Sequence, residues 1–327
     1  MPQDSSRPPY RPVDAMVYPR FEGIRTFMRL PNVTDLTGVD VAVVGVPFDT
    51  GGTYRVGARF GPSGIRQESM LLRPYNPELR VNVFETLSMV DYGDLPVTPG
   101  YLPESHAQIA EAAATIVDAG VTPVFLGGDH SVSLPLLRAV ARRHGPVGLV
   151  HFDAHNDLWH SYFGGKDTHG TPFRRAVEEG LLDPGRSIQV GLRGSLYGPE
   201  DVTMSESLGM AMIRATDMHH LGVPAVIDRI RDRAGSGPLY LSFDIDFLDP
   251  VYAPGTGTPE VGGATGLQAL ALLRGLTGLA FVAYDLVEVM PPYDVGSVTS
   301  LLAANLAYEM ISLVAVAKEQ AAATDRR

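Results

Sequence analysis

The segment PLYLSFDIDFLDP (238–250) is the most informative about the fold, because a short apolar run in it is followed directly by aspartates. Near-continuous apolar content of this kind predicts a strand covered on both faces, as in a parallel sheet. The segments VGLVHFDAHND (147–157) and TPVFLGGDHS (122–131) repeat the pattern, with Asp, His and Gly after the apolar run. Ligands of parallel sheets bind beyond the carboxyl ends of the strands, so these polar ends mark a candidate site.

Further apolar runs predict three more strands: DVAVVGVPF (40–48), RSIQVGLRG (186–194) and LAFVAYDLVEV (279–289). Helix-like segments lie between the runs, at 104–119, 133–143, 223–234 and 267–276. This alternation is typical of βαβ units. No linker-like segment and no repeat divides the chain. We therefore expect an extended, Pro-rich N-terminal arm (1–20) followed by a single α/β domain (21–327).

The composition narrows the class of protein. Of the 327 residues, 45% are hydrophobic and 19% are charged, which is ordinary for a packed globular chain and excludes disorder. The net charge of −11 argues against nucleic-acid binding, which depends on clustered Lys and Arg. The chain contains no cysteine, so any bound metal must be held by His, Asp or Glu.

No segment predicts secretion or a membrane anchor. The first twenty residues are polar and Pro-rich, without the apolar core of a signal peptide. The longest apolar stretch, 301–317, contains Asn305, Glu309 and Ser312, so we expect a buried C-terminal helix there and no membrane span. These features predict a cytoplasmic protein without a membrane partner.

Six acidic and histidine side chains follow the predicted strands at spacings that bring them together. They are His130, Asp153, His155, Asp157, Asp244 and Asp246. Residues two apart in an extended segment project to the same side, so each motif presents its groups in one direction. Four gathered carboxylates would repel one another, and two divalent cations would remove that repulsion. Oxygen and imidazole ligands suit Mn²⁺ and permit Ni²⁺, Co²⁺ or Fe²⁺, whereas Ca²⁺ prefers oxygen alone.

The motifs GGDHS (127–131), DAHND (153–157) and SFDIDFLDP (242–250) resemble the three signatures of the ureohydrolase family of arginases, agmatinases and guanidino-acid hydrolases. The resemblance covers nearly the whole chain and includes FMRLP (27–31), GVPFDTG (45–51), GARFGPSGIR (57–66), THGTPFRRA (168–176), APGTGTPE (253–260) and DLVEVMPPYD (285–294). It favours the agmatinase and guanidino-acid branch over arginase proper. It implies a three-layer α/β/α sandwich around a mostly parallel sheet, in agreement with the predicted strands.

The resemblance also implies how two metal ions would be held. One ion would bind His130, Asp153, Asp157 and Asp244, and the other Asp153, His155, Asp244 and Asp246, with Asp153 and Asp244 bridging. The expected cofactors are two divalent ions per chain, with Mn²⁺ as the first choice and Ni²⁺ as the second.

The catalytic residues that the resemblance implies are Glu288, His169 and Asp157. A carboxylate at Glu288 can accept two N–H bonds from a planar guanidinium and aim its carbon at metal-bound hydroxide. His169 lies in a Gly-flanked loop, where it could pass a proton to the departing amine. The expected reaction releases urea and an amine from a small guanidino compound.

The segment LWHSYF (158–163) departs from the family, which usually places small polar residues at the mouth of the pocket. Trp159 is the only tryptophan, and with Tyr162 and Asn156 it is predicted to bind substrate in a short, partly aromatic pocket. Such a loop aromatic can also pack against a neighbouring subunit. The surrounding segments resemble enzymes for short guanidino acids, so guanidinopropionate and guanidinobutyrate are expected ahead of agmatine.

Other interpretations stay open at this point. An aromatic pocket without an evident carboxylate clamp also suits N-alkylated guanidines or biguanides such as metformin. The chain could be a catalytically silent family subunit, or a deacetylase-like amide hydrolase, which would use one metal ion and would not need Glu288. The family implies a trimer or hexamer, with a paralogous subunit as one option. His106 lies in a predicted helix without a partner motif, so we expect it at the surface.

Overall fold

The computed structural model describes residues 8–324, in which eight parallel strands form one sheet. Across the sheet the strands are β4 (Met89–Asp94), β1 (Val41–Gly45), β5 (Thr122–Leu126), β10 (Phe281–Val287), β9 (Leu239–Asp244), β6 (Gly148–Phe152), β7 (Ile188–Leu192) and β8 (Ala211–Arg214). A separate antiparallel pair is formed by β2 (Tyr75–Asn76) and β3 (Val81–Asn82).

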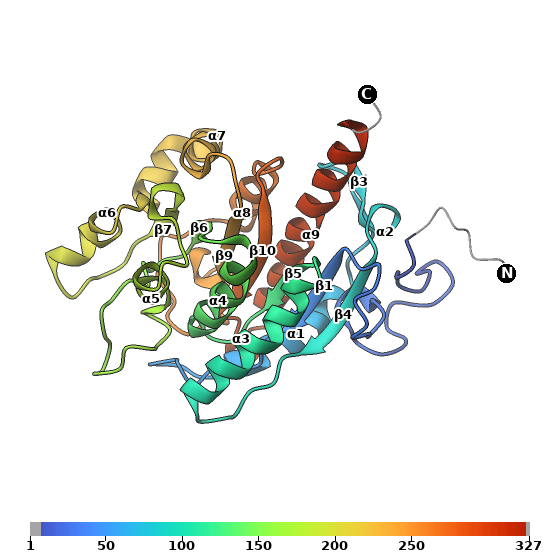
Figure 1. The fold of residues 1–327 in the computed structure, drawn as a ribbon, viewed down its shortest axis with the longest axis horizontal. Coiled ribbons are helices and arrows are strands. Elements are labelled where there is room, and N and C mark those ends of the chain that lie inside the picture. The colour runs from blue at the N-terminus through green and yellow to red at the C-terminus, as the bar shows by residue number, and fades with distance from the viewer. Residues whose placement is uncertain (1–7, 325–327) are drawn as a thin grey trace.

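Helices cover both faces of the sheet, which confirms the predicted α/β/α sandwich (Figure 1). One face carries α3 (Leu102–Asp118), α4 (Ser133–His144) and α5 (Pro172–Glu178). The other carries α1 (Gly61–Ser69), α7 (Ala215–Ala234), α8 (Gly266–Arg274) and α9 (Val298–Thr324). The short helices α2 (Val83–Thr86) and α6 (Met204–Ser207) lie between strands in the chain. Successive side chains of β1 enter the two cores alternately, because strand residues point to opposite faces.

All six strands predicted from apolar runs are present, and the two strands of the eight-stranded sheet that the runs did not predict are its edges. Edge strand β4 ends in exposed and half-buried residues, and β8 has only one fully buried residue. An edge strand needs apolar side chains at fewer positions than a central one. The pattern used for the prediction is therefore absent from both edges.

The predicted helices are also present, including the buried C-terminal one, with one difference of interest. Helix α7 begins eight residues before the predicted start, because the chain continues through a kink at Gly222, where φ is +76°, and Pro224. The C-terminal helix α9 is long and apolar enough to cross a membrane, but it is mostly buried and packs against α1 and α8. It is therefore a core helix of this fold.

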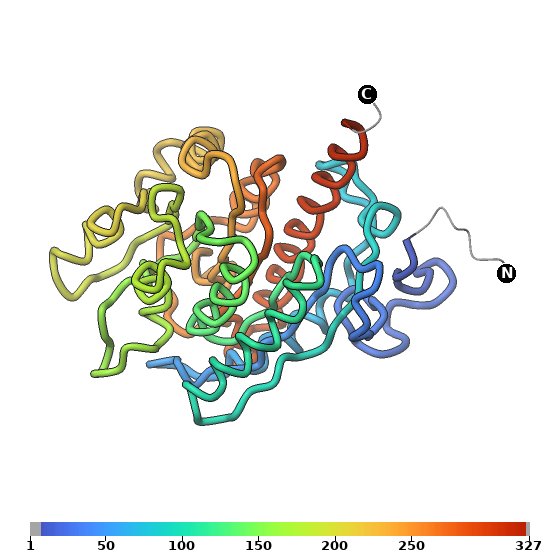
Figure 2. Tube along the Cα trace, viewed as in Figure 1, coloured from blue at the N-terminus to red at the C-terminus, as the bar shows by residue number. Residues whose placement is uncertain are grey.

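The described part of the predicted N-terminal arm runs along the β4 edge. Residues 8–20 contain turns but no helix or strand, and residues 1–7 of the arm lie outside the described residues. The Met89 amide donates to the Tyr10 carbonyl oxygen at 3.1 Å, and the Tyr10 amide donates to Ser88 Oγ at 3.4 Å. Figure 2 shows this first segment, in blue, at the end of the molecule opposite the yellow segments around α6 and α7.

Candidate functional site

The polar ends of four neighbouring strands meet at one edge of the sheet. Strands β5, β10, β9 and β6 are adjacent, and each delivers a predicted site residue where it ends. His130 begins the 3-10 helix that follows β5, and Asp153 follows β6 directly. Asp244 is the last residue of β9, and Glu288 is the first residue after β10. Parallel strands thus gather at one place residues that are far apart in sequence.

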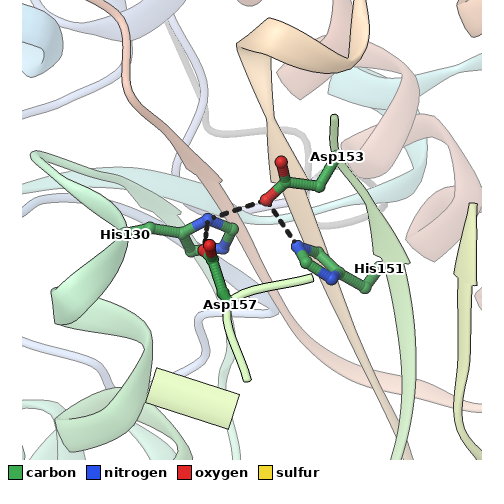
Figure 3. A group of neighbouring side chains, drawn as sticks. All are labelled: His130, His151, Asp153 and Asp157. Atoms are coloured by element: carbon green, nitrogen blue, oxygen red, sulfur yellow. Dashed lines mark hydrogen bonds and ion pairs between the residues drawn. The ribbon is translucent and has the colours of Figure 1, made fainter. Parts of the chain in front are cut away.

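His130 forms the centre of the first group of ligands. Its Nδ1 lies 3.1 Å from Asp153 Oδ2, 2.9 Å from Asp157 Oδ2 and 3.2 Å from Asp244 Oδ2. Figure 3 shows His130, Asp153 and Asp157 pointing toward one another. This nitrogen is buried and has no hydrogen-bond partner among residues 8–324. A buried imidazole nitrogen surrounded by carboxylate oxygens fits a metal cation between them.

The hydrogen bond of His130 Nε2 places the ring proton on that nitrogen, which leaves Nδ1 free to bind a metal ion. Ser242 Oγ donates its proton to Asp285 Oδ1 at 2.6 Å, so it can only accept from His130 Nε2, which lies 2.8 Å away. With the proton on Nε2, the lone pair of Nδ1 faces the carboxylates. The hydroxyls of Ser133 and Tyr240 each donate a hydrogen bond to Asp285 Oδ2 at 2.6 Å, which fixes the position of this carboxylate.

A second group of ligands shares Asp153 with the first. His155 Nδ1 lies 3.1 Å from Asp246 Oδ2 and 3.5 Å from Asp153 Oδ1. Asp153 therefore presents one oxygen to each histidine, an arrangement that suits a bridging carboxylate. Asp244 contacts the first group through Oδ2, while its Oδ1 accepts the Asp246 amide at 2.8 Å. The structure thus brings all six predicted ligands into one cluster.

The cluster concentrates negative charge in a buried place. Burial raises the pKa of Asp244 well above its ordinary value, and the charges of Asp246 and Asp153 raise it further. Burial likewise raises the pKa of Asp246, with the charge of Asp153 as the next cause. Cations bound among these carboxylates would remove the repulsion.

His151 also belongs to the cluster, as a support for Asp153 (Figure 3). Its Nε2 lies 2.8 Å from Asp153 Oδ2, and its Nδ1 lies 2.8 Å from Gln189 Nε2. Because the Gln189 amide can only donate, His151 carries its proton on Nε2 and donates to Asp153. Both ring nitrogens are thereby occupied.

Glu288 lies next to His130 of the cluster and is 3% exposed. Its Oε1 accepts the His130 amide at 2.8 Å, and its own amide donates to the Gly128 carbonyl oxygen at 2.9 Å. Its φ is +61°, an uncommon value for a residue with a side chain, and such values concentrate at functional sites. A Cβ at Gly128 would lie 1.7 Å from the Phe48 carbonyl oxygen, so only glycine allows this close approach.

His169 links Glu288 to the cavity that opens beside the cluster. Its Nδ1 lies 3.5 Å from Glu288 Oε1, and its Nε2 lies 2.6 Å from Thr53 Oγ1. The His169 amide donates to the Gly51 carbonyl oxygen at 3.0 Å, which fixes the loop. His169 lines the cavity, whereas Glu288 is not among the lining residues.

The charge state of His169 in the metal-free protein gives a first testable prediction. Burial alone lowers the pKa of His169, but the hydrogen bond and charge of Glu288 outweigh burial and raise this pKa to about 9. The interaction of protonated His169 with Glu288 then stabilises the folded protein. This stabilisation is fully present below the pKa of a free histidine, about 6.5, and is lost as pH rises through about 9. We expect NMR titration of the metal-free protein to show this pKa, and Glu288→Gln to lower it. An unchanged His169 pKa in that variant would contradict the assignment.

The cavity has a volume of about 460 Å³ and an aromatic wall. The Trp159 ring lies 4.6 Å from the Tyr162 ring and 5.5 Å from the Tyr197 ring, measured between centroids. Trp159 Nε1 donates to Asp201 Oδ1 at 3.0 Å, and the hydroxyls of Tyr162 and Tyr197 lie 3.0 Å apart. Asn156 also lines the cavity, but its Oδ1 accepts the Leu158 amide.

Only part of the segment 158–163 faces the cavity. Trp159 and Tyr162 line it, whereas Leu158 is fully buried in the core beneath α4 and α5. His160 is exposed and pairs with Glu178 at 3.8 Å, and Phe163 is also exposed. The segment therefore contributes two side chains, those of Trp159 and Tyr162, to the cavity wall.

Sequence reasoning missed several residues of the cavity wall. These are Thr53, Arg55, Tyr197, Asp201 and Arg214. Thr53 follows the GVPFDTG motif and Tyr197 follows a predicted strand, so both positions carried a signal. Arg214 ends the edge strand β8, which the apolar pattern did not predict.

His106 was expected at the surface, and the structure shows that this prediction is wrong. The side chain is 3% exposed, because α3 turns it toward the loop after β5. Its Nε2 lies 3.3 Å from Ser131 Oγ, beside His130. Burial lowers the pKa of His106 to about 4, with the charge of Arg138 as the next cause, so this histidine is neutral at pH 7.

The fold and the site together define a class: a three-layer α/β/α protein with a carboxylate and imidazole cluster able to hold metal ions at the carboxyl edge of its sheet. A sequence model of the arginase family matches residues 39–312. The chain belongs to the arginase family. The structure of arginase from Bacillus caldovelox shares the fold, with a TM-score of 0.71 at 24% identity over 84% of this chain and 98% of that one.

Relatives with higher identity are hydrolases of guanidino compounds by name. The guanidinopropionase of Pseudomonas aeruginosa is 48% identical over 93% of this chain and 96% of that enzyme. The guanidinobutyrase of the same organism is 47% identical over 93% and 97%. The structure of proclavaminate amidino hydrolase from Streptomyces clavuligerus has a TM-score of 0.88 at 40% identity, covering 92% of this chain and all of that one.

Proposed function

We propose that this chain is a ureohydrolase that cleaves a C–N bond of a small guanidino compound and releases urea and an amine. The observation that carries the proposal is Asp153, because one of its oxygens faces His130 and the other faces His155, next to a cavity that His155 and His169 line. Membership of the arginase family supports it. An amide hydrolase that uses one metal ion would not need the second group of ligands, which contains His155 and Asp246.

The residues proposed to hold two divalent ions are His130, Asp153, His155, Asp157, Asp244 and Asp246. The His130 Nδ1, which has no hydrogen-bond partner among residues 8–324, and the raised pKa of Asp244 both fit a set of metal ligands. When bound, two such ions lower the pKa of water and stabilise developing negative charge. Mn²⁺ is proposed first and Ni²⁺ second, because oxygen and imidazole ligands suit both.

The chain's own residues would orient the substrate and move its proton. A guanidinium is planar and positively charged, so the carboxylate of Glu288 would accept its N–H groups and fix its orientation. His169, protonated beside Glu288 and at the cavity wall, would donate a proton to the departing amine. Thr53 Oγ1 lies 2.6 Å from Nε2 of the same imidazole and fixes its orientation by a hydrogen bond.

The proposed substrates are short guanidino acids, guanidinopropionate and guanidinobutyrate, ahead of agmatine. The relatives named guanidinopropionase and guanidinobutyrase, at 48% and 47% identity, support this choice, and a relative named agmatinase, at 48%, makes agmatine the next compound to test. N-alkylated guanidines and biguanides are the second candidate, because the wall of Trp159, Tyr162 and Tyr197 can contact methyl groups and cations.

Urea release tests the proposed function directly. The full chain, loaded separately with Mn²⁺ or Ni²⁺, would be assayed on guanidinopropionate, guanidinobutyrate, agmatine, dimethylguanidine and a biguanide. We expect urea from at least one guanidino acid. Metal bound at two ions per chain without urea from any of the compounds would identify a silent family member instead.

Trp159 and Tyr162 are expected to set the preference among substrates. Replacing them by Asn and Met should lengthen and open the cavity, since both rings lie on its wall. A pocket distinguishes one methylene by about 1–3 kcal/mol, so the ratio of kcat/KM between substrates should shift by roughly 10- to 200-fold. Metal content should stay at the wild-type level. An unchanged ranking of the substrates would show that other residues set the preference.

Assembly into a trimer or hexamer and a cytoplasmic location stay predictions. Exposed apolar side chains between residues 13 and 24, including Met16, Phe21 and Ile24, offer contact surface. Two relatives, the agmatinase of Gallus gallus and the guanidino acid hydrolase of Homo sapiens, are named as mitochondrial.

A further inference from the structure

Three arginines line the cavity, and they differ in what their guanidinium groups contact. Arg193 gives its N–H groups to backbone carbonyls, among them those of Asp246 at 2.6 Å and Glu260 at 2.8 Å. Arg55 donates to the Thr256 carbonyl oxygen at 3.2 Å and lies over the Tyr293 ring, 5.0 Å from its centroid. The guanidinium groups of these two arginines already contact backbone carbonyls or an aromatic ring of the protein.

Arg214 differs, because its guanidinium makes no hydrogen bond and no ion pair with any residue in the range 8–324. It ends β8 and lies on the cavity wall with Met212 of the same strand. An arginine carries five N–H donors and a permanent charge, and it matches a carboxylate with two parallel hydrogen bonds. Arg214 is therefore available to a ligand in the cavity.

Asp201 and Glu260 also line the cavity, and neither forms an ion pair with Arg214. Asp201 accepts from Trp159 Nε1 and from the Tyr197 amide at 3.1 Å. Glu260 lies against Gly194, where an added Cβ would be 2.4 Å from the Glu260 carboxyl carbon. Arg214 thus lines the same cavity as His155, Asp157 and Asp244 of the cluster without an ion-pair partner among residues 8–324.

We propose that Arg214 binds the carboxylate of the substrate while the guanidinium lies at the metal cluster. This inference rests on the proposed function and names its substrate class: guanidino acids with three or four carbons in the acid chain. It supplies the carboxylate clamp that the sequence did not reveal. The ammonium tail of agmatine would meet a like charge at the same place.

The spacing of the strands agrees with this span. Asp153 directly follows β6, Arg214 is the last residue of β8, and β7 lies between these two strands. Two strand spacings amount to about 9.5 Å. Bond lengths give about 5–6 Å from the guanidinium carbon to the carboxyl carbon of these acids, and an arginine side chain reaches about 7 Å from its Cα. Substrate and Arg214 together cover the distance between the two strands.

The test compares Arg214→Ala with a matched control, Arg229→Ala, an exposed arginine on α7 away from the cavity. In the metal-loaded enzyme, kcat/KM for guanidinobutyrate and guanidinopropionate should fall about 10- to 100-fold in Arg214→Ala, mainly through KM, as a lost charged hydrogen-bond pair predicts. Methylguanidine, which has no tail, should react as in the wild type. Arg214→Glu should raise the preference for agmatine over the acids.

A binding measurement makes the test independent of turnover. Trp159 is the only tryptophan and lines the cavity, so its fluorescence reports on ligands there. Guanidinobutyrate should bind Arg214→Ala about tenfold more weakly than it binds the wild type or Arg229→Ala. Equal losses for every substrate, or unchanged binding and KM for the acids, would overturn the inference. Absence of urea from every compound in the wild type would instead overturn the proposed function.

Discussion

Replacing Asp244 by alanine is expected to lower kcat by at least about a thousandfold, because metal ions contribute several kcal/mol of charge stabilisation and each 1.36 kcal/mol is tenfold in rate. Asp244 Oδ2 lies 3.2 Å from His130 Nδ1, and its Oδ1 holds the Asp246 amide. The substitution would remove one ligand oxygen and release the backbone that positions another ligand. Elemental analysis should show fewer than two ions per chain, together with the loss of urea release.

Asp244→Asn separates loss of metal from loss of fold. It keeps an oxygen for the Asp246 amide but removes the charge. Because the folded metal-free protein raises the pKa of Asp244, it binds that proton more tightly than the unfolded chain does. Metal-free wild type therefore loses stability as pH rises through this pKa, and metal-free Asp244→Asn should melt at a higher temperature at pH 7. The control is Asp228→Ala, an exposed carboxylate on α7, which should keep both metal and activity. Two ions per chain and full turnover in Asp244→Ala would refute the bridging role.

The central part of the sheet could be predicted from sequence because burial on both faces leaves a strong apolar pattern. Four of these strands, β5, β10, β9 and β6, lead into His, Asp or Glu, so the position of the cluster followed from the rule that parallel strands align their carboxyl ends. The edge strands β4 and β8 carry no such pattern, and with β8 the position of Arg214 was missed. His106 was misplaced because a helix face cannot be assigned from one polar residue.

Contacts between side chains were less predictable than the positions of strands. Motif spacing indicates that Asp153 and His130 approach each other, but not that the two Asp153 oxygens divide between two histidines. The tautomer of His130 depends on Ser242 and Asp285, which are distant in sequence. Such details arise from tertiary packing, which brings groups from several strands to distances of about 3 Å.

Glu288→Gln is expected to lower kcat/KM for every guanidino substrate by about 100- to 1000-fold, because it removes hydrogen bonds to a charged group and the orientation they impose. The amide has the same shape as the carboxylate, so the hydrogen bond to the His130 amide and the φ of +61° can persist. Metal content should therefore stay close to two ions per chain, in contrast to Asp244→Ala. Loss of metal in Glu288→Gln would show that this residue supports the ligand loop and does not orient substrate.

A double-mutant cycle with His169 decides how Glu288 acts. Glu288 lies outside the cavity wall and 3.5 Å from His169, which is on the wall. If Glu288 acts only by keeping His169 protonated, the losses in His169→Asn and Glu288→Gln will not add, and the double variant will resemble either single one. If Glu288 also binds the guanidinium, the double variant will lose more than either, and guanidinobutyrate will bind Glu288→Gln more weakly in the Trp159 fluorescence titration. We expect the second result, because a protonated imidazole alone offers no acceptor for the N–H groups of a guanidinium, whereas a carboxylate accepts two.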